Sequence, residues 1–349
     1  MKGSITVLGC CEIYLTSVIN PLISLWPKTL FSRIRKAYLF DETWVIERPQ
    51  LKEVMNEEKM VPDRYIIFPD SADSDLIVGI LNRETGVGLF NERIVSAEKI
   101  PFAEIVRLPS CRDADDSHLL FLKDKERSAL HTAKTKLLEA RKYNDAIRQV
   151  YDGAIQEREV KPFSEAILTE LLPKSMKKNK KTATDAAYFG TNGGDGPTFI
   201  GRFPIPVERY FIIKSENSTF PSQLLSRLVD RATEQGYDLL LYHCPFYPDE
   251  WDGVILSEIK TAVVESRSPH EIEPLHPHDK VISCVGLFQN RYHLFNYAME
   301  LREWEAKYKQ YMRQAVMALR EYGKYKRLQM FGYSHLPQLS HLLHLIDEK

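Results

Sequence analysis

The chain has 349 residues, of which 44% are hydrophobic and 27% charged, and its formal net charge is −1. These values are typical of a globular protein with two domains of ordinary size. The near-neutral charge excludes a global field that attracts nucleic acid or an acidic membrane. No apolar run reaches the roughly 20 residues of a membrane span. The five cysteines form neither a disulfide framework nor a CxxC zinc pattern, so we expect a cytoplasmic protein without nucleic-acid or membrane partners.

The N-terminal half predicts strands and helices in alternation. The expected strands cover residues 5–8, 37–40, 65–68, 76–81 and 86–90, which are rich in β-branched or aromatic residues. The apolar run 13–26 predicts a buried helix, because no small-residue cleavage site follows it as a signal peptide requires. Further helices are expected over 51–59, 129–156 and 163–172.

The C-terminal half predicts the same kind of alternation. A basic segment without apolar periodicity, 173–184, predicts a linker. Strands are expected over 209–214, 238–243 and 261–264, and helices over 221–234, 292–329 and 336–346. Gly236 lies where the glycine that ends a helix is usually found.

The two halves also repeat each other in pattern. Segment 35–54 recurs as 209–227, and segment 63–81 recurs as 237–256, about half the chain length later. A repeat this long predicts a domain duplication rather than a solenoid. We therefore expect two α/β domains, each a mostly parallel sheet with flanking helices and a C-terminal helical hairpin. The predicted domains are 1–172 and 185–349, joined by the linker 173–184.

In each half, one strand–loop–helix segment lies where a P-loop is found. A P-loop reads Gly-x-x-x-x-Gly-Lys-Ser/Thr, because its glycines turn backbone N–H groups toward phosphate and its lysine carries charge to it. In the second half, Ser215 and Phe220 occupy the glycine positions and Pro221 the lysine position, followed by Ser222. Proline removes the ammonium and one N–H donor together.

The first half departs from the P-loop pattern further. Its corresponding positions hold Thr43, Arg48, Pro49 and Gln50, with the bulky residues 44–46 between them. The acid expected beside magnesium at the end of a neighbouring strand is Glu265 in the second half, whereas the first half has Asn91. Neither half has the residues of a working phosphate loop.

A resemblance to a known family is found in four segments of the sequence, 104–108, 136–143, 236–256 and 262–270. The sequence resembles uncharacterised bacterial proteins built from two tandem P-loop ATPase domains, sometimes labelled nucleotide kinases. The resemblance covers most of the chain and implies a P-loop NTPase fold in each half. The phosphate-binding motif of the family is absent here, so the resemblance implies a degenerate member without both Walker A motifs.

Three functional hypotheses follow. The first is a non-catalytic pseudo-NTPase with a regulatory or protein-interaction role, with no cofactor, an unknown protein partner and homo-oligomerisation left open. The second is an active ATPase or nucleotide kinase that binds ATP and Mg²⁺. Its contacts in the second half would be Lys214, Ser215, Ser218, Thr219, Ser222 and Glu265.

The third hypothesis is a metal-dependent hydrolase. His243, Cys244 and His270 lie in one region of the second half, together with His276 and His278. Histidine and cysteine are zinc ligands, but their spacing here matches no standard zinc motif. Loop packing is the simpler role for His243 and His270.

Overall fold

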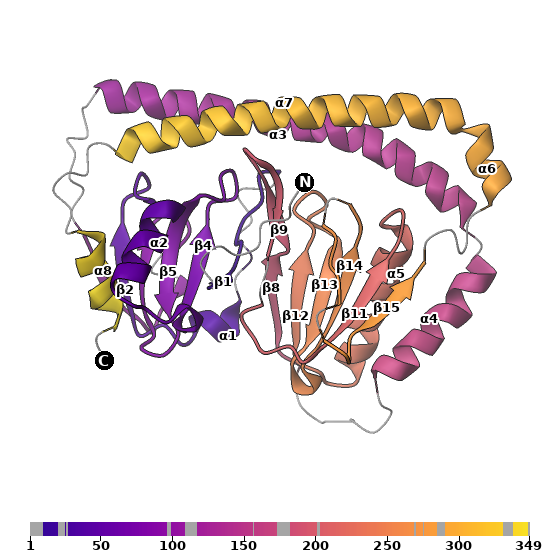
Figure 1. The fold of residues 1–349 in the computed structure, drawn as a ribbon, viewed down its shortest axis with the longest axis horizontal. Helices are drawn as coiled ribbons and strands as arrows, with labels where there is room; N and C mark the ends of the chain where they lie inside the picture. The colour runs from indigo at the N-terminus through magenta and orange to yellow at the C-terminus, as the bar shows by residue number, and fades with distance from the viewer. Residues whose placement is uncertain are drawn as a thin grey trace. The chain divides into compact units, whose positions relative to one another are not determined.

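Two mixed β-sheets organise the protein in the computed structural model (Figure 1). The structure describes residues 10–19, 25, 27–95, 99–108, 117–155, 157–172, 182–200, 203–268, 270–274, 276–284, 290–330 and 338–347. The predicted strand 5–8 and most of the predicted linker 173–184 lie outside these residues.

The first sheet has the strand order β1-β4-β5-β6-β2-β7, with β3 paired to β5. Its strands are β1 (Cys11–Glu12), β2 (Lys36–Phe40), β3 (Ile46–Glu47), β4 (Tyr65–Pro69), β5 (Leu76–Asn82), β6 (Val87–Asn91) and β7 (Glu104–Arg107). β5 runs antiparallel to β4 and β6, whereas the pairs β1–β4, β6–β2 and β2–β7 are parallel. All residues of β4, β5 and β6 are buried, so both faces of this part of the sheet are covered.

The second sheet has the strand order β8-β12-β13-β14-β11-β15. Its strands are β8 (Thr184–Tyr188), β11 (Arg209–Lys214), β12 (Leu239–His243), β13 (Trp251–Leu256), β14 (Thr261–Ser266) and β15 (Lys280–Ser283). β13 runs antiparallel to both neighbours, and the other pairs are parallel. The two sheets therefore share one strand order and one pattern of strand directions. A separate hairpin joins β9 (Gly190–Gly193) to β10 (Gly196–Phe199).

The α/β class with mostly parallel sheets and flanking helices is confirmed. The helix predicted over 13–26 is wrong for its described residues, because residues 13–19, 25 and 27 are not helical and the first helix in the described part of the chain is α1 (Lys28–Phe31). The Ile13 N–H donates to the Ile67 carbonyl at 3.1 Å, and Ile13 and Tyr14 are fully buried. The apolar run thus pairs with the sheet rather than with itself, because sheet pairing satisfies its buried backbone.

Corresponding helices follow corresponding strands, α2 (Arg48–Glu57) after β2 and α5 (Thr219–Glu234) after β11. Helix α5 buries an apolar stripe against its sheet that includes Phe220, Leu224 and Leu228. The helix ends at Gly236 as predicted. Gly236 has a φ of 79°, a left-handed backbone conformation that glycine adopts readily and most other residues do not. The helix predicted over 292–329 is interrupted at Tyr297, between α6 (Arg291–Asn296) and α7 (Ala298–Met330).

The chain forms two compact units whose sequences are interleaved. The first unit contains residues 2–135, 190–204 and 314–349, and the second contains 136–189 and 205–313. The boundaries fall inside α3 (Ser117–Ala154) and α7, so each long helix contributes to both units. The predicted domains 1–172 and 185–349 therefore differ from the units that the contacts define.

The C-terminal helix of each half belongs to the unit built on the other half's sheet. Helix α4 (Glu157–Leu171) places Ile167, Leu168 and Leu171 in the core of the second unit, beside Leu224. Helix α8 (Leu339–Asp347) places its apolar face in the core of the first unit, with Leu342, Leu343 and Ile346.

Polar contacts fix α8 on the first sheet as well. The Asp347 carboxylate accepts hydrogen bonds from the Tyr65 hydroxyl at 2.5 Å and from the Asn82 amide at 2.8 Å. The Thr85 hydroxyl donates to the Ile346 carbonyl at 2.6 Å, which satisfies one of the free carbonyl groups at the end of the helix.

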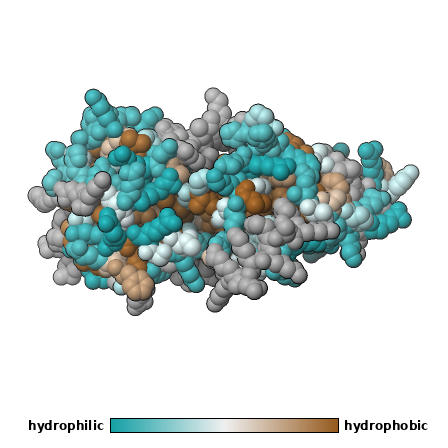
Figure 2. Space-filling model, turned by 90° about the horizontal axis from the view of Figure 1, so that it is seen from below, coloured by the Kyte–Doolittle hydropathy of each residue, from teal (hydrophilic) through white to brown (hydrophobic). Residues whose placement is uncertain are grey.

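None of the helices in the described ranges combines the length and the apolar composition that a membrane span requires. Figure 2 shows one face of the molecule, where hydrophilic residues cover much of the surface and hydrophobic residues appear between them.

The exchange of α4 and α8 predicts that neither half folds alone. Fragments 1–172 and 173–349 each lack the helix that covers their sheet, and burial of one leucine contributes about 1.5–3 kcal/mol. We expect each fragment expressed alone to be protease-sensitive, and the co-expressed fragments to copurify as one resistant complex. Limited proteolysis and size-exclusion chromatography measure this. A stable, cooperatively unfolding fragment 173–349 would contradict the exchange.

Candidate functional site

The loop between β11 and α5 is closed by its own residues. Phe220, in the first turn of α5, is 4% exposed, and its ring packs into the core on Phe163 of α4 with ring centroids 5.7 Å apart. The Thr219 N–H donates to the Asn217 side-chain oxygen at 3.0 Å, and the Ser215 hydroxyl donates to the Asn217 carbonyl. Because these donors have partners within the loop, they do not point into an open anion nest.

The other predicted phosphate contacts of the second half bond to carboxylates. The Thr219 hydroxyl donates to Asp152, and the Ser222 hydroxyl donates to Glu250 at 3.2 Å. The Lys214 ammonium lies 2.5 Å from Glu273. Ser218 is buried at the start of α5, and its side chain makes no capping hydrogen bond there. These residues therefore lie near one another but among negative charges, which repel phosphate.

The loop between β2 and α2 is closed in the same manner by an aromatic ring. Trp44 is 3% exposed and stacks on Phe40, with centroids 4.1 Å apart. The Asp41 carboxylate accepts the Thr43 N–H at 2.8 Å, and the Asn91 amide donates to the Trp44 carbonyl at 2.7 Å. Asn91, which stands opposite the acid position of the second half, thus holds the loop.

A buried cluster of two carboxyl groups and one imidazole lies at the carboxyl end of β14. Asp252, Glu265 and His270 each offer a ligand atom, and these atoms lie within 4.8 Å of one another. The three residues are 3%, 1% and 5% exposed, respectively. Such a donor set is one that binds a divalent metal ion.

Local backbone geometry brings the three side chains together. Gly253 pairs with Val264 in the antiparallel β13–β14 ladder, so Asp252 lies beside Glu265. The register between β12 and β13 shifts at this point, where Tyr242 faces Gly253 and His243 faces Trp251. Asp252 is the extra residue of this bulge, and a bulge re-aims the side chain that it carries.

A tight turn after β14 returns His270 to the cluster. The Arg267 N–H donates to the His270 carbonyl at 3.2 Å, and His270 Nε2 lies 3.9 Å from Glu265 Oε2. The Arg267 guanidinium contacts the other oxygen of Glu265 at 2.7 Å. Arginine therefore fixes the orientation of this carboxylate.

Burial controls the ionisation of the cluster. Loss of solvation, together with the nearby Glu265, raises the pKa of Asp252 to about 8. Desolvation raises the pKa of Glu265 as well. Desolvation and the charge of Arg267 lower the pKa of His270 to about 3. The imidazole is thus neutral at physiological pH, the form in which histidine binds metal.

The remaining predicted metal ligands have other positions. The His243 ring contacts the Pro248 carbonyl at 2.6 Å and packs edge-on against Trp251. Cys244 is buried and is one of the groups that lower the pKa of Asp252, so it lies beside the cluster. His276 and His278 are exposed. The structure therefore brings together His270 and Glu265 from the sequence predictions, with Cys244 adjacent.

Sequence reasoning missed Asp252. The strand 251–256 was not among the predicted strands, and without it nothing placed this acid opposite Glu265. A signal was present, since an aspartate that begins an apolar strand segment is unusual unless it has a partner.

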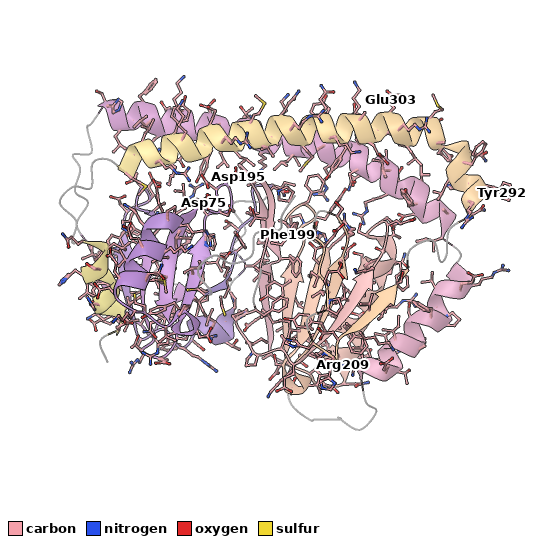
Figure 3. The ribbon with its side chains drawn as sticks, in the orientation of Figure 1. Asp75, Asp195, Phe199, Arg209, Tyr292 and Glu303 are labelled. Carbon is pink, nitrogen blue, oxygen red and sulfur yellow. The ribbon has the colours of Figure 1, made fainter. Side chains whose placement is uncertain are left out.

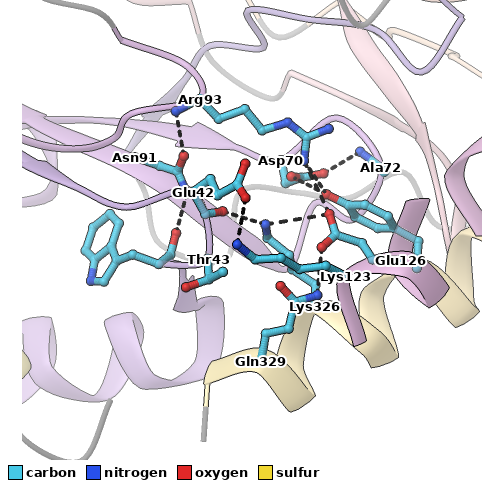
Figure 4. A network of polar contacts seen from close by, with 12 residues as sticks. Glu42, Thr43, Asp70, Ala72, Asn91, Arg93, Lys123, Glu126, Lys326 and Gln329 are labelled. Atoms are coloured by element: carbon cyan, nitrogen blue, oxygen red, sulfur yellow. Dashed lines mark hydrogen bonds and ion pairs between the residues drawn. The ribbon is translucent and has the colours of Figure 1, made fainter. Parts of the chain in front are cut away.

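The first unit has a different polar centre at the carboxyl end of its sheet (Figure 4). The Lys326 ammonium is buried, donates to the Glu42 carbonyl at 2.7 Å and lies 3.7 Å from Glu126. Desolvation lowers the pKa of Lys326, and Glu126 opposes this effect. The Arg93 guanidinium lies 3.4 Å from Glu126, and the Tyr322 hydroxyl donates to Asp70 at 2.9 Å.

Lys326, Glu126 and Arg93 border a cavity of about 200 Å³. Its lining consists of Glu42, Arg93, Lys123, Glu126, Arg127, Leu130, Lys326 and Gln329. Four of these residues are cationic and two are acidic, so the cavity carries an excess of positive charge. Glu42 lies in the loop that corresponds to the P-loop position of the first half. Ligands of open α/β sheets commonly bind at this carboxyl edge.

Comparisons with protein-family models, with curated proteins and with solved structures each found no match for this chain.

The pKa of Asp252 predicts a loss of stability in metal-free protein between pH 6.5 and pH 8. The folded state keeps a proton that the unfolded state has released, so unfolding becomes easier as pH rises, by at most about 1.4 kcal/mol per pH unit. His270 has the opposite sign but acts below pH 6.5, because its folded pKa is the lower one. Urea unfolding at both pH values should show this decline in the wild type.

Asp252→Asn should remove most of that decline, whereas the exposed Asp249→Asn should keep it. If the free energy of unfolding falls equally with pH in the wild type and in Asp252→Asn, the decline does not come from Asp252.

Proposed function

We propose that the protein is a non-catalytic pseudo-NTPase with a regulatory or protein-interaction role. One observation supports this proposal: in both halves the segment at the phosphate-binding position directs its N–H groups to its own side chains and buries an aromatic residue in the core, Phe220 or Trp44. A phosphate group needs inward-facing N–H groups instead.

The relation to P-loop proteins is supported by the arrangement of the elements. Each loop joins a parallel strand to a helix at the carboxyl edge of its sheet. β11 lies beside β14, and Ile213 pairs with Glu265, which is the relation of a phosphate loop to the magnesium-binding strand. The shared strand order of the two sheets supports an origin by internal duplication.

The charges around the second loop oppose nucleotide binding. Asp152 and Glu250 accept hydrogen bonds from the hydroxyl groups of α5, and Lys214 is paired with Glu273. An ATPase or nucleotide kinase would have to break these contacts and bring a polyphosphate next to carboxylates. A metal-dependent hydrolase would need a coordination position that faces substrate, whereas Asp252, Glu265 and His270 are at most 5% exposed.

The cavity of the first unit suits a small anionic ligand as the regulatory signal. Arg93, Lys123, Arg127 and Lys326 outnumber Glu42 and Glu126 on its walls. A small anion with two negative charges would balance this excess positive charge. A nucleic acid would instead need a positive field over a larger part of the surface. The cavity is small, so phosphate or pyrophosphate fits its size class better than a whole nucleotide.

An exposed apolar surface in the second unit supports the interaction role. On α6 and the start of α7, Tyr292, Phe295 and Met299 are 85%, 78% and 74% exposed, and Figure 3 shows the Tyr292 side chain projecting outward. Apolar side chains that gather on a surface are typical of protein-binding sites.

The closed loops predict that the protein does not bind Mg²⁺-ATP. We expect no saturable heat in isothermal titration calorimetry and no thermal shift at millimolar nucleotide, because a bound ligand would add RT ln(1 + [L]/Kd) to stability. Saturable, magnesium-dependent ATP binding would refute the proposal. Turnover abolished by Glu265→Gln would establish the active enzyme instead.

The charged cavity predicts that pyrophosphate stabilises the protein. We expect a saturable rise in melting temperature at constant ionic strength, reduced at least threefold at equal pyrophosphate in Lys123→Ala and Arg127→Ala. Lys125→Ala is the matched control, because it removes the same charge from an exposed position on the same helix outside the cavity. An equal shift in all four proteins would assign the effect to nonspecific screening.

A further inference from the structure

We propose that the second unit contains a structural site for one divalent transition-metal ion, with Zn²⁺ as the best fit, held by Asp252, Glu265 and His270. The three side chains come from three backbone positions that the fold fixes independently: a bulge in β13, the end of β14 and the turn after it.

The geometry of the cluster is close to that of a coordinated ion. The three ligand atoms lie within 4.8 Å of one another, and a metal–ligand distance of about 2.0–2.2 Å brings them to roughly 3.4 Å in a tetrahedral site.

One buried atom of the cluster has no partner within the protein. The Asp252 Oδ2 atom is fully buried and has no hydrogen-bond partner. A buried carboxylate oxygen without a partner costs about 1–3 kcal/mol or more, and buried charges are usually paired or bound to metal. A cation between Asp252 and Glu265 would satisfy this atom.

The surroundings select the kind of metal. An imidazole nitrogen with two carboxylate oxygens suits Zn²⁺ better than Mg²⁺ or Ca²⁺, which prefer oxygen ligands alone. Arg267 holds Glu265 Oε1 at 2.7 Å, which leaves Oε2 on the side of His270. An outer contact of this kind orients a metal ligand.

The corresponding positions of the first sheet support a site specific to the second unit. There the bulge residue is Val78, because Phe68 faces Gly79 and Pro69 faces Ile77, and Asn91 stands where the second sheet has Glu265. The backbone frame is the same in both sheets, but only the second places ligating side chains on it. Because the same bulge holds a valine in the first sheet, the bulge can form without a buried aspartate, and Asp252 needs another explanation.

Metal binding to the protein treated with chelator and then dialysed tests the proposal. With Zn²⁺ alone as the probe, we expect one ion per chain to be retained after gel filtration, measured by atomic emission. Mg²⁺ should not be retained. Asp252→Asn and His270→Gln should each weaken Zn²⁺ binding at least tenfold, whereas His276→Gln with His278→Gln should leave it unchanged, because these two histidines are exposed and outside the cluster.

Thermal unfolding supplies a second readout that does not depend on the variants. Saturating Zn²⁺ should raise the melting temperature of the wild type, and Asp252→Asn should lose this rise while circular dichroism shows that it is folded. If His270→Gln does not fold, Asp252→Asn decides the outcome. Failure of the wild type to retain zinc, or equal retention by Asp252→Asn, would overturn the proposal.

Discussion

The exchange of α4 and α8 is the constraint on which the rest of the structure depends. In each unit, the helix from the other half packs beside the helix that belongs to the sheet's own half, α4 beside α5 and α8 beside α2, and completes the same hydrophobic core. Leu168 and Leu343 are 0% and 1% exposed because of this exchange, and either burial contributes about 1.5–3 kcal/mol. Folding of the two sheets is therefore coupled, although each unit has a hydrophobic core of its own.

The same frame carries opposite chemistry at its two carboxyl edges. In the first unit, Lys326 is buried beside Glu126, and cationic side chains border a cavity. In the second unit, two carboxyl groups and a neutral imidazole converge with a single arginine. Buried charges are stable only when they are paired. The edge of the first sheet therefore favours an anionic ligand, and the edge of the second favours a cationic one. The anion proposed for the first unit and the cation proposed for the second would complete the charge balance of these two centres.

Much of this frame could be predicted from the sequence, because strands such as 209–214 and helices such as 221–234 have a clear periodicity. The run 13–26 misled the prediction because its apolar residues pair with β4, and periodicity does not report on such distant partners. The exchange of helices could not be predicted from the sequence either. An amphipathic pattern shows which face of α4 is apolar but not which sheet that face packs against. Asp252 was missed because its role depends on a bulge that only strand pairing defines.

Under the proposed relation to P-loop proteins, the closed loops show how phosphate binding can be lost without loss of the fold. A working phosphate loop keeps several N–H groups turned inward for a ligand, and such preorganised sites reduce stability. Here Asp41 and Asn217 accept the N–H groups of Thr43 and Thr219, and the neighbouring Trp44 and Phe220 are buried in the two hydrophobic cores. Under the proposal, each of these residues adds a contact within the protein where a working loop would contact phosphate. A lysine at position 221 alone would not create a phosphate site, because the Thr219 N–H would still be bonded to Asn217 and the Thr219 and Ser222 hydroxyl groups would still be bonded to carboxylates.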